Sequence, residues 1–297
     1  MKLLFTGASG FIGNITTSYL KDKYEVFSMG LTPHDDYQID IKNEIKELIE
    51  SFDVVLHAAG KAHSIPRNEE EILDFYKVNL QGTKNLCKAF ESNPPKAFVF
   101  VSTVAVYGME SGENIDEGYP LIGDTPYAQS KIEAEKFLKE WCNTHNVKLA
   151  IIRPSLIAGK NPPGNLGAMI NGIKTGKYLR IGKGHTRKSV LMAEDIARLL
   201  PKLIEKGGTY NVCDNTHPSF YELEQLISKQ LGKGSPLAIP LWIANLFAKV
   251  GDLLGEKAPI NSAKLSKITQ PLTFSNEKAK RELGWEPLSV LENFKIQ

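Results

Sequence analysis

Short apolar runs alternate with amphipathic segments in the first half of the chain. Segments 68–92 and 127–145 carry apolar residues at helical spacing and lie between such runs. Continuous apolar strands that alternate with helices indicate a parallel sheet with helices on both faces. We therefore predict a doubly wound α/β domain with right-handed crossovers. The expected buried strands are KLLFTG (2–7), YEVFSMG (24–30), DVVLHAAG (53–60), KAFVFVST (96–103) and VKLAIIRP (147–154).

After residue 154 the pattern changes to Gly-, Pro- and Lys-rich loops between shorter elements. We interpret residues 1–154 as the doubly wound domain and residues 155–297 mainly as a smaller α/β lobe. Segments near 190–215 are expected to return to the first domain. A ligand cleft should lie between the two, because open α/β sheets bind ligands beyond the carboxyl ends of their strands. The shorter elements expected are a strand-like piece at 209–214 and helices near 193–206 and 219–231.

The most apolar long stretch is PLAIPLWIANLFAKVGDLLG, residues 236–255. Pro240, Asn245, Lys249 and Asp252 interrupt it, so it falls short of the ~18 uninterrupted apolar residues of a membrane span. We predict a packed helix with an apolar face and no membrane partner.

Composition and charge narrow the class of protein. The 297 residues are 42% hydrophobic and 24% charged, which is typical of a globular protein. The 36 basic and 34 acidic residues form no basic block, so nucleic acid is not expected as a partner. Cys87, Cys142 and Cys213 are far apart and odd in number, which predicts neither a metal site nor a disulfide framework and fits the cytoplasm.

A glycine-rich loop directly follows the first expected strand. TGASGFIG places Gly7, Gly10 and Gly13 around Phe11 and Ile12, at the expected start of a helix. Glycine lets the chain turn sharply and lets its backbone approach a diphosphate closely. A helix N-terminus adds N–H donors and partial positive charge. This arrangement predicts a dinucleotide site that includes these five residues.

The second strand lacks the acid that usually holds the adenosine ribose of NAD. It ends in Ser28, Met29 and Gly30, with neither a carboxylate nor an arginine for a 2′-phosphate. The choice between NAD and NADP as the cofactor therefore stays open. Asp40 and Ile41, in QIDIKN, are candidates for contact with the adenine, and Asp40 has the alternative role of a helix N-cap.

The stretch DTPYAQSKIEAEKF (124–137) sets Tyr127 and Lys131 one helical turn apart, after Pro126 at the expected helix start. The pair is either a proton-transfer site or a chance pairing on a solvated helix, and these residues alone do not decide between the two.

Four stretches occur together in one order: TGASGFIG, LHAAG, STVAVYG and YAQSK. Together they resemble the extended short-chain dehydrogenases/reductases, in the NAD-dependent epimerase/dehydratase family that acts on nucleotide sugars. The resemblance extends to EKAKRELGWEP (277–287) and is strongest to UDP-sugar 4-epimerases and 4-keto-sugar reductases of bacterial polysaccharide pathways. It implies that residues 1–154 form an NAD(P)-binding Rossmann domain and that residues 155–297 mainly form a substrate-binding lobe. It also implies an NAD cofactor, with NADP not excluded, and a UDP-linked sugar as substrate.

The resemblance also implies catalytic roles. Tyr127 matches the family's catalytic base and Lys131 its lysine, which also holds the nicotinamide ribose. Thr103 matches the residue that hydrogen-bonds the reacting oxygen. A nearby ammonium and a positive nicotinamide favour the phenolate of a tyrosine whose ordinary pKa is about 10. Tyr127 would then take a proton from a sugar hydroxyl while hydride leaves the same carbon.

Further positions match the cofactor site by the same resemblance. Ala58, Ala59 and Gly60 would line the pyrophosphate and ribose side, and Asn79 would lie near the nicotinamide half. Asn79 has the alternative role of a polar residue inside a helix. We interpret His57 as a hydrogen-bonded strand-end histidine rather than as a catalyst.

For the substrate, Asn165 and Arg187 match positions that bind the diphosphate, and a guanidinium suits phosphate oxygens. A solvated surface arginine is the alternative for Arg187. Val104 and Ala105 follow Thr103 where the dehydratases have Asp-Glu, which argues against 4,6-dehydration. Leu156 replaces a polar sugar contact, so the sugar is not identified.

Three hypotheses follow. The first is a UDP-sugar C4 epimerase that retains its cofactor. The second is an NAD(P)H-dependent reductase of a UDP-4-keto-6-deoxy-sugar, which the missing second-strand acid mildly favours. The third is a non-catalytic NAD(P)-binding sensor. The family's usual four-helix contact, here through 68–92 and 127–145, predicts a homodimer.

Overall fold

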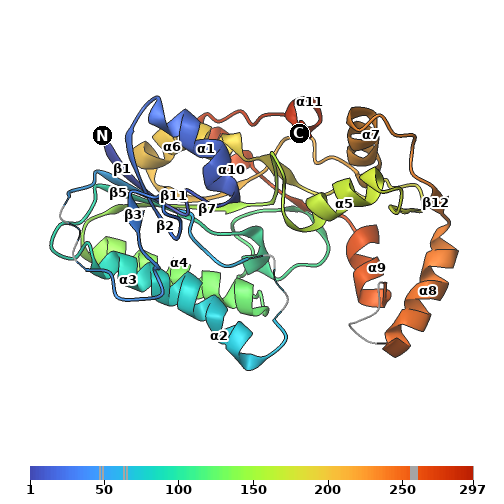
Figure 1. Cartoon of the computed structure of the whole chain (residues 1–297), viewed down its shortest axis with the longest axis horizontal. Coiled ribbons are helices and arrows are strands. Elements are labelled where there is room, and N and C mark those ends of the chain that lie inside the picture. Colours follow the sequence, from blue (N-terminus) through green and yellow to red (C-terminus); the bar gives the residue numbers. More distant parts are fainter. Residues whose placement is uncertain (47, 49, 63, 65, 255–259, 297) are drawn as a thin grey trace.

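A seven-stranded parallel sheet forms the centre of the computed structural model (Figure 1). The structure describes residues 1–46, 48, 50–62, 64, 66–254 and 260–296. The strand order is β11-β7-β5-β4-β1-β2-β3. Successive strands are added first on one side of β1 and then, from β4 onward, on the other, so the doubly wound prediction is confirmed. The strands are β1 (Lys2–Thr6), β2 (Glu25–Gly30), β3 (Tyr37–Gln38), β4 (Val54–His57), β5 (Ala97–Val101), β7 (Lys148–Pro154) and β11 (Gly208–Val212).

Both faces of this sheet are buried, which explains the continuous apolar runs of its strands. Within β1, Leu3 and Phe5 belong to one core cluster while Leu4 belongs to the other. The first cluster lies under α1 (Phe11–Lys21), α6 (Glu194–Lys206) and α10 (Glu277–Leu283). The opposite face packs against α3 (Gly82–Lys88) and α4 (Pro126–Thr144). The helix α2 (Glu69–Tyr76) continues into α3 through the π-helix η1 (Lys77–Gln81).

The second half of the chain forms a smaller lobe on one side of the sheet (Figure 1). Its main core joins α5 (Gly164–Lys174), α7 (Phe220–Gln230) and α11 (Val290–Asn293). Because β11, α6 and α10 lie on the main sheet, the chain passes between the two parts more than once. The division at residue 154 stays an interpretation. The other elements are η2 (Val104–Tyr107), β6 (Gly112–Ile115), β8 (Leu156–Ala158), β9 (Arg180–Ile181), β10 (Val190–Met192), β12 (Ala238–Ile239), α8 (Leu241–Leu254), α9 (Ser262–Thr269) and β13 (Leu272–Phe274).

The predicted apolar helix is present as α8, but the expectation that its apolar face packs is wrong. The buried residues of α8 are the small Ala244, Ala248 and Gly251. Their spacing of four and three positions lets another segment approach the helix closely. The large apolar side chains consequently lie on the outer side, where Phe247 is 57% exposed. Within the described residues no helix is both long and apolar enough to cross a membrane.

A capping box fixes the start of α7. The Ser219 hydroxyl accepts a hydrogen bond from the Glu222 N–H at 3.2 Å, and the Glu222 carboxylate accepts one from the Ser219 N–H at 2.8 Å. These bonds satisfy two N–H groups that a helix start leaves without partners.

Replacing Ser219 with Ala should lower the free energy of unfolding by about 1 kcal/mol, because one of these N–H groups loses its acceptor. Urea titration followed by circular dichroism measures the change. The control is Ser266→Ala, an exposed position within α9, which should leave the unfolding midpoint unchanged. Equal midpoints for Ser219→Ala and the wild type would contradict the capping role.

Candidate functional site

The glycine-rich loop between β1 and α1 packs directly against the loop after β4. Gly7 has φ +78°, and a Cβ there would lie 2.7 Å from the Ala59 nitrogen, so only glycine fits. Gly10 occupies the N-cap of α1 and has no side chain to bond the N–H groups of the first turn. Those N–H groups are suited to an anion such as a diphosphate. The loop therefore fits the dinucleotide site predicted from the sequence.

A carboxylate that sequence reasoning missed lies at the end of β2. A Cβ built on Gly30 would lie 2.6 Å from Asp35 Oδ2 and 2.9 Å from Ser9 Oγ. Asp35 thus fills the space that a side chain at residue 30 would occupy, beside the glycine-rich loop. The carboxylate accepts hydrogen bonds from the Thr32 N–H and hydroxyl at 2.9 and 2.7 Å, which fix the turn after β2. The pair Asp35–Asp36, which begins five positions after Gly30, was the signal in the sequence that could have indicated this carboxylate.

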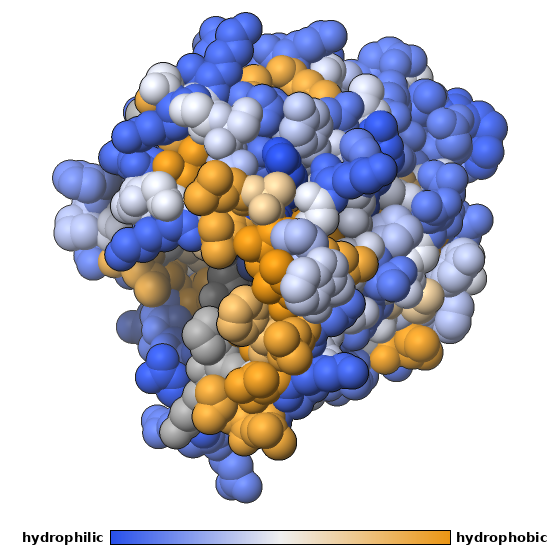
Figure 2. Space-filling model, turned by 90° about the vertical axis from the view of Figure 1, so that its right-hand side faces the viewer, coloured by the Kyte–Doolittle hydropathy of each residue, from blue (hydrophilic) through white to orange (hydrophobic). Residues whose placement is uncertain are grey.

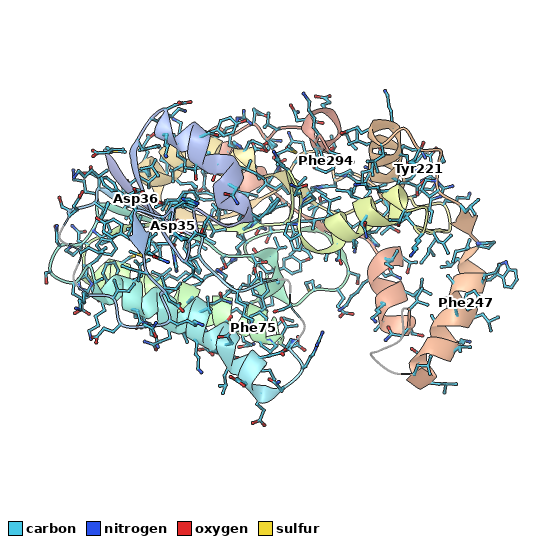
Figure 3. All side chains as sticks on the ribbon, in the orientation of Figure 1. Asp35, Asp36, Phe75, Tyr221, Phe247 and Phe294 are labelled. Atoms are coloured by element: carbon cyan, nitrogen blue, oxygen red, sulfur yellow. The ribbon has the colours of Figure 1, made fainter. Side chains whose placement is uncertain are left out.

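Asp36 beside it has a different role. Its carboxylate accepts hydrogen bonds from the N–H and the hydroxyl of Ser28 at 2.7 and 2.8 Å. The backbone hydrogen bond from Ser28 lowers the pKa of Asp36. Figure 3 shows both aspartates beside the strands β2 and β3. Asp36 ties the turn to its strand and is exposed, whereas Asp35 is buried against the loop.

Asp40 and Ile41 lie in a turn. The Asp40 carboxylate accepts a hydrogen bond from the Lys42 N–H at 3.0 Å within this turn, so the alternative of a helix N-cap is wrong. The Ile41 side chain is 6% exposed and packs closely against Gly82 of α3. A contact between these residues and adenine stays a prediction.

Asn79 joins the loop after β4 to helix α4. It lies in η1 and is 1% exposed. Its amide oxygen accepts from the Lys61 N–H at 2.8 Å, and its amide nitrogen donates to Ser130 Oγ at 2.9 Å. A Cβ on Gly60 would lie 3.0 Å from Asn79 Oδ1 and 3.2 Å from Lys131 Nζ, so Gly60, Asn79 and Lys131 meet at one point.

The three predicted catalytic side chains also meet at this edge of the sheet. Thr103 ends the segment after β5, where its hydroxyl accepts from the Ala105 N–H at 3.1 Å. Tyr127 and Lys131 are one turn apart on α4, whose N-cap is Thr125 and whose first residue is Pro126. The Tyr127 hydroxyl lies beside the Thr103 hydroxyl, which acts to lower the pKa of Tyr127.

Electrostatics at this site are set by burial. Burial raises the pKa of Tyr127, and the Thr103 hydroxyl opposes this. Burial lowers the pKa of Lys131 to about 8, partly offset by the charge of Glu135. The Lys131 ammonium donates to the Val101 carbonyl at 2.9 Å and lies 4.5 Å from the centre of the Phe100 ring.

A buried polar network behind the site was not predicted. Glu135, one turn after Lys131, accepts from Arg153 Nε and Nη2 at 3.0 and 2.6 Å and from the Ser102 hydroxyl at 2.5 Å. Arg153 also donates to the Tyr107 hydroxyl at 2.9 Å, which donates to Asn211 at 2.7 Å. The network joins α4 to β5, β7, β11 and η2. The i, i+4 spacing of Tyr127, Lys131 and Glu135 was the signal for its first member.

His57 is structural, as interpreted from the sequence. It is fully buried and contacts the hydroxyls of Thr6 at 2.6 Å and Thr83 at 2.9 Å. Burial, followed by the charge of Lys131, lowers its pKa to about 3. Among the described residues no group of three or more His, Cys, Asp or Glu is arranged to hold a metal ion.

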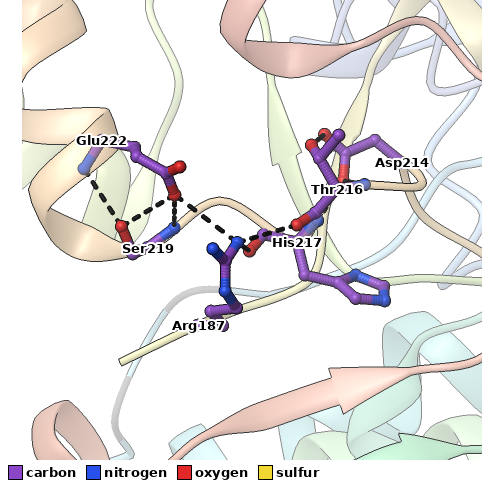
Figure 4. A network of polar contacts seen from close by, with 6 residues as sticks. All are labelled: Arg187, Asp214, Thr216, His217, Ser219 and Glu222. Atoms are coloured by element: carbon purple, nitrogen blue, oxygen red, sulfur yellow. Dashed lines mark hydrogen bonds and ion pairs between the residues drawn. The ribbon is translucent and has the colours of Figure 1, made fainter. Parts of the chain in front are cut away.

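The predicted substrate residues lie outside this cluster. Asn165 is exposed in the first turn of α5. Arg187 donates to the Thr216 and His217 carbonyls at 3.0 and 2.9 Å and lies 3.5 Å from the Glu222 carboxylate (Figure 4). It is thus an anchored arginine on an open pocket of about 410 Å³. Residues of segments 113–114, 185–187 and 269–273 line this pocket with His217, so the three catalytic candidates lie elsewhere. The predicted role of Arg187 in binding the substrate diphosphate stays a prediction.

Lys131→Met should stabilise the cofactor-free protein at pH 7 by about 1–3 kcal/mol, because it removes a buried charge. The lysine titrates near pH 8 when folded and near 10.5 when unfolded. The unfolded wild type therefore binds more protons between these values, and wild-type stability rises there. The advantage of the variant should be constant below pH 8 and should shrink as the pH rises toward 10.5. Urea unfolding of both proteins at pH 7 and pH 10 measures this, and an equal difference at both pH values would contradict it.

Comparison with known proteins agrees with this geometry. The family model described as "NAD dependent epimerase/dehydratase family" matches residues 3–213. The chain is 28% identical over 294 residues to the N-acetyl-alpha-D-glucosaminyl-diphospho-ditrans,octacis-undecaprenol 4-epimerase of Escherichia coli O157:H7, covering 93% of this chain and 88% of the relative. It is 27% identical over 325 residues to a UDP-glucose 4-epimerase of Vibrio cholerae, covering 99% and 93%.

A solved structure shares the fold. It is the UDP-glucuronic acid 4-epimerase from Bacillus cereus in complex with UDP-glucuronic acid and NAD, with a TM-score of 0.77, 20% identity and coverage of 99% of this chain and 96% of the other. Because the family model matches well over half of the sequence, the chain belongs to the NAD-dependent epimerase/dehydratase family of enzymes.

Proposed function

We propose that this protein is an NAD-dependent C4 epimerase of a sugar carried on UDP. The observation that supports this most directly is Tyr127, whose hydroxyl lies beside that of Thr103 and which is one turn before Lys131, at the sheet edge that holds the glycine-rich loop. Sequence relatives that are 4-epimerases of UDP-glucose and of a diphospho-linked N-acetylglucosamine support the same chemistry. These relatives share a sugar on a diphosphate.

Each side chain of the cluster has a defined task. Tyr127 removes the proton from the sugar's 4-hydroxyl, and Thr103 holds the same oxygen by a hydrogen bond. Lys131 favours the Tyr127 phenolate by its charge. When bound, NAD would supply the acceptor for the C4 hydride and the donor for its return to the opposite face of the sugar. Tyr127 then gives its proton back to the oxygen, so the reaction has no net redox change.

The residues present fit NAD. The Gly10 N-cap leaves the first-turn N–H groups of α1 without a side-chain acceptor, and Asp35 supplies a carboxylate near the end of β2. A carboxylate there suits the 2′-hydroxyl of NAD and repels the 2′-phosphate of NADP. Asp35 thus favours the epimerase over the exchangeable-cofactor reductase, reversing the preference drawn from the missing second-strand acid. The 4-keto reductase is the second candidate. The third hypothesis, a non-catalytic sensor, is disfavoured because it gives the cluster of Thr103, Tyr127 and Lys131 no role.

We further propose a homodimer through α2 and α4. Ile72 and Leu73 on α2 are 36% and 54% exposed, which leaves apolar side chains for a second copy to cover. Sedimentation velocity on the purified protein tests this, and a monomer at micromolar concentration would refute it.

Replacing Tyr127 with Phe should reduce the interconversion of UDP-sugar C4 epimers by at least about 100-fold, because the acid–base hydroxyl is lost. Cofactor binding should persist. Chromatography of the UDP-sugars measures turnover, and nucleotide released by denaturation measures retained cofactor. Tyr19→Phe, on the exposed side of α1, is the matched control and should keep full activity. Full turnover in Tyr127→Phe would refute the assignment.

The nucleotide released from the wild type distinguishes the two candidate enzymes. Stoichiometric NAD favours the epimerase, whereas a protein that releases no nucleotide and consumes NAD(P)H with a 4-keto sugar favours the reductase.

Asp35→Asn should shift cofactor preference toward NADP by about tenfold or more, because the change removes the repulsion of a 2′-phosphate. Dissociation constants for NAD and NADP from calorimetry give the ratio. Asp36→Asn keeps the neighbouring position and the same chemical change, and it should leave the ratio unaltered. A ratio that moves in both variants, or in neither, would contradict the role of Asp35.

A further inference from the structure

The outer side of α8 carries a continuous apolar surface. We call it the α8 apolar face and define it as Trp242, Leu246, Phe247, Val250, Leu253 and Leu254, each between 53% and 87% exposed. At 100° per residue these side chains fall within an arc of about 140°. Soluble proteins seldom expose large apolar side chains in such a group without a partner.

The helix is held with this face outward. Its inner side packs Ala244 and Ala248 against Leu265 of α9. Asp252, on a third side, accepts hydrogen bonds from the Ser262 N–H and hydroxyl at 2.9 and 2.6 Å. Because both contacts would break if α8 rotated, the apolar side chains cannot turn into the core.

The surface continues onto the small sheet before α8. Leu237 is 77% exposed and Leu179 is 49% exposed. The Arg180 N–H donates to the Leu237 carbonyl at 2.9 Å, so the two segments lie side by side. Figure 2 shows the apolar residues as a ridge that extends down to the tip of this face. In Figure 3 Phe247 lies on α8, the outermost element at this end of the molecule.

Charge is distributed unequally between the two parts of the chain. Residues 155–297 contain 20 lysines and arginines against 12 acidic residues, a net charge of +8, whereas residues 1–154 carry −6. Lys249 on α8 and Lys183, two residues after β9, are exposed beside the apolar ridge. An apolar ridge with aromatic side chains and a basic surround is suited to the headgroup region of an anionic bilayer.

We propose that the α8 apolar face docks this protein on an anionic lipid surface. Trp242, Phe247 and the leucines enter the boundary between headgroups and acyl chains, while the basic side chains of the lobe meet the lipid phosphates. The helix lies in the plane of the surface and does not cross it. This departs from the expectation, drawn from the sequence, that no membrane is involved.

A second copy of the chain fits this face less well. A 14-residue helix is about 21 Å long, and half of its surface presents on the order of 400 Å². A stable dimer buries about 800 Å² on each partner. A net charge of +8 on residues 155–297 of each copy would also repel an identical copy, whereas it attracts anionic lipid.

Trp242 supplies a direct readout. It is 69% exposed, whereas Trp141 and Trp285, the other two of the three tryptophans, are 7% and 5% exposed. Vesicles of phosphatidylcholine with 30% phosphatidylglycerol should shift the wild-type emission to shorter wavelength, and brominated acyl chains should quench it. Neutral phosphatidylcholine vesicles, or high salt, should give a weaker response. Trp242→Phe should lose the shift and keep vesicle binding in co-sedimentation.

Phe247→Glu should reduce the vesicle-bound fraction by at least about tenfold, because it replaces a large aromatic side chain with a charge about halfway along the apolar face. Tyr19→Glu makes the same change at an exposed aromatic residue of α1 and should bind like the wild type. A wild type that stays in the supernatant with anionic vesicles, or equal binding of Phe247→Glu, would overturn the proposal. So would a vesicle-independent dimer that Phe247→Glu dissociates. Turnover of soluble UDP-sugar should be unchanged in Phe247→Glu, so this test and that of the C4 chemistry fail separately.

Discussion

The buried ion pair between Glu135 and Arg153 sets the position of α4, and the proposed catalytic cluster depends on that helix. Tyr127, Lys131 and Glu135 share one face because they are four positions apart. Arg153 comes from β7, and Ser102, which also bonds Glu135, follows β5. A slip of one residue along α4 would move its side chains by 1.5 Å and 100° and would separate Tyr127 from Thr103. Removing one partner of such a buried pair typically costs about 3–5 kcal/mol, so slipped arrangements are strongly disfavoured.

The cluster that this pair positions is not at its electrostatic optimum in the protein alone. Burial favours the neutral form of both groups, because it raises the pKa of Tyr127 and lowers that of Lys131. A positive charge near the phenol would favour the phenolate that acid–base chemistry needs. Part of the free-energy cost of burying these two groups is therefore compensated only when a positive charge binds beside them. Active sites commonly carry such a cost in stability. Glu135 limits this cost by favouring the charged form of Lys131.

Local patterns were sufficient for the fold. The five apolar runs and the glycine-rich loop all became the expected elements, because a strand buried on both faces consists mainly of apolar residues. The Tyr127–Lys131 pair needed the resemblance to a family as well as its spacing. Asp35 was missed because its position depends on the path of the turn after β2. The outward side of α8 was missed because apolar periodicity shows which residues share a face, whereas small residues decided which face packs. The Arg153 network joins residues more than 100 positions apart, such as Tyr107 and Asn211, and no local pattern marks it.

The origin of the Asp35 carboxylate has a consequence for how such proteins are compared. Gly30 ends the second strand, where dinucleotide-binding folds usually have an acid, and the Asp35 carboxylate fills the space beside it from five residues further on. Because this residue belongs to a turn and not to the strand, the turn can change in length or sequence while β2 keeps its pairing with β1. Nucleotide preference in such a chain can then diverge between close homologues without any change in the sheet. If Asp35 selects the nucleotide as proposed, classification by the residue that ends the second strand would assign a chain such as this one to the wrong nucleotide.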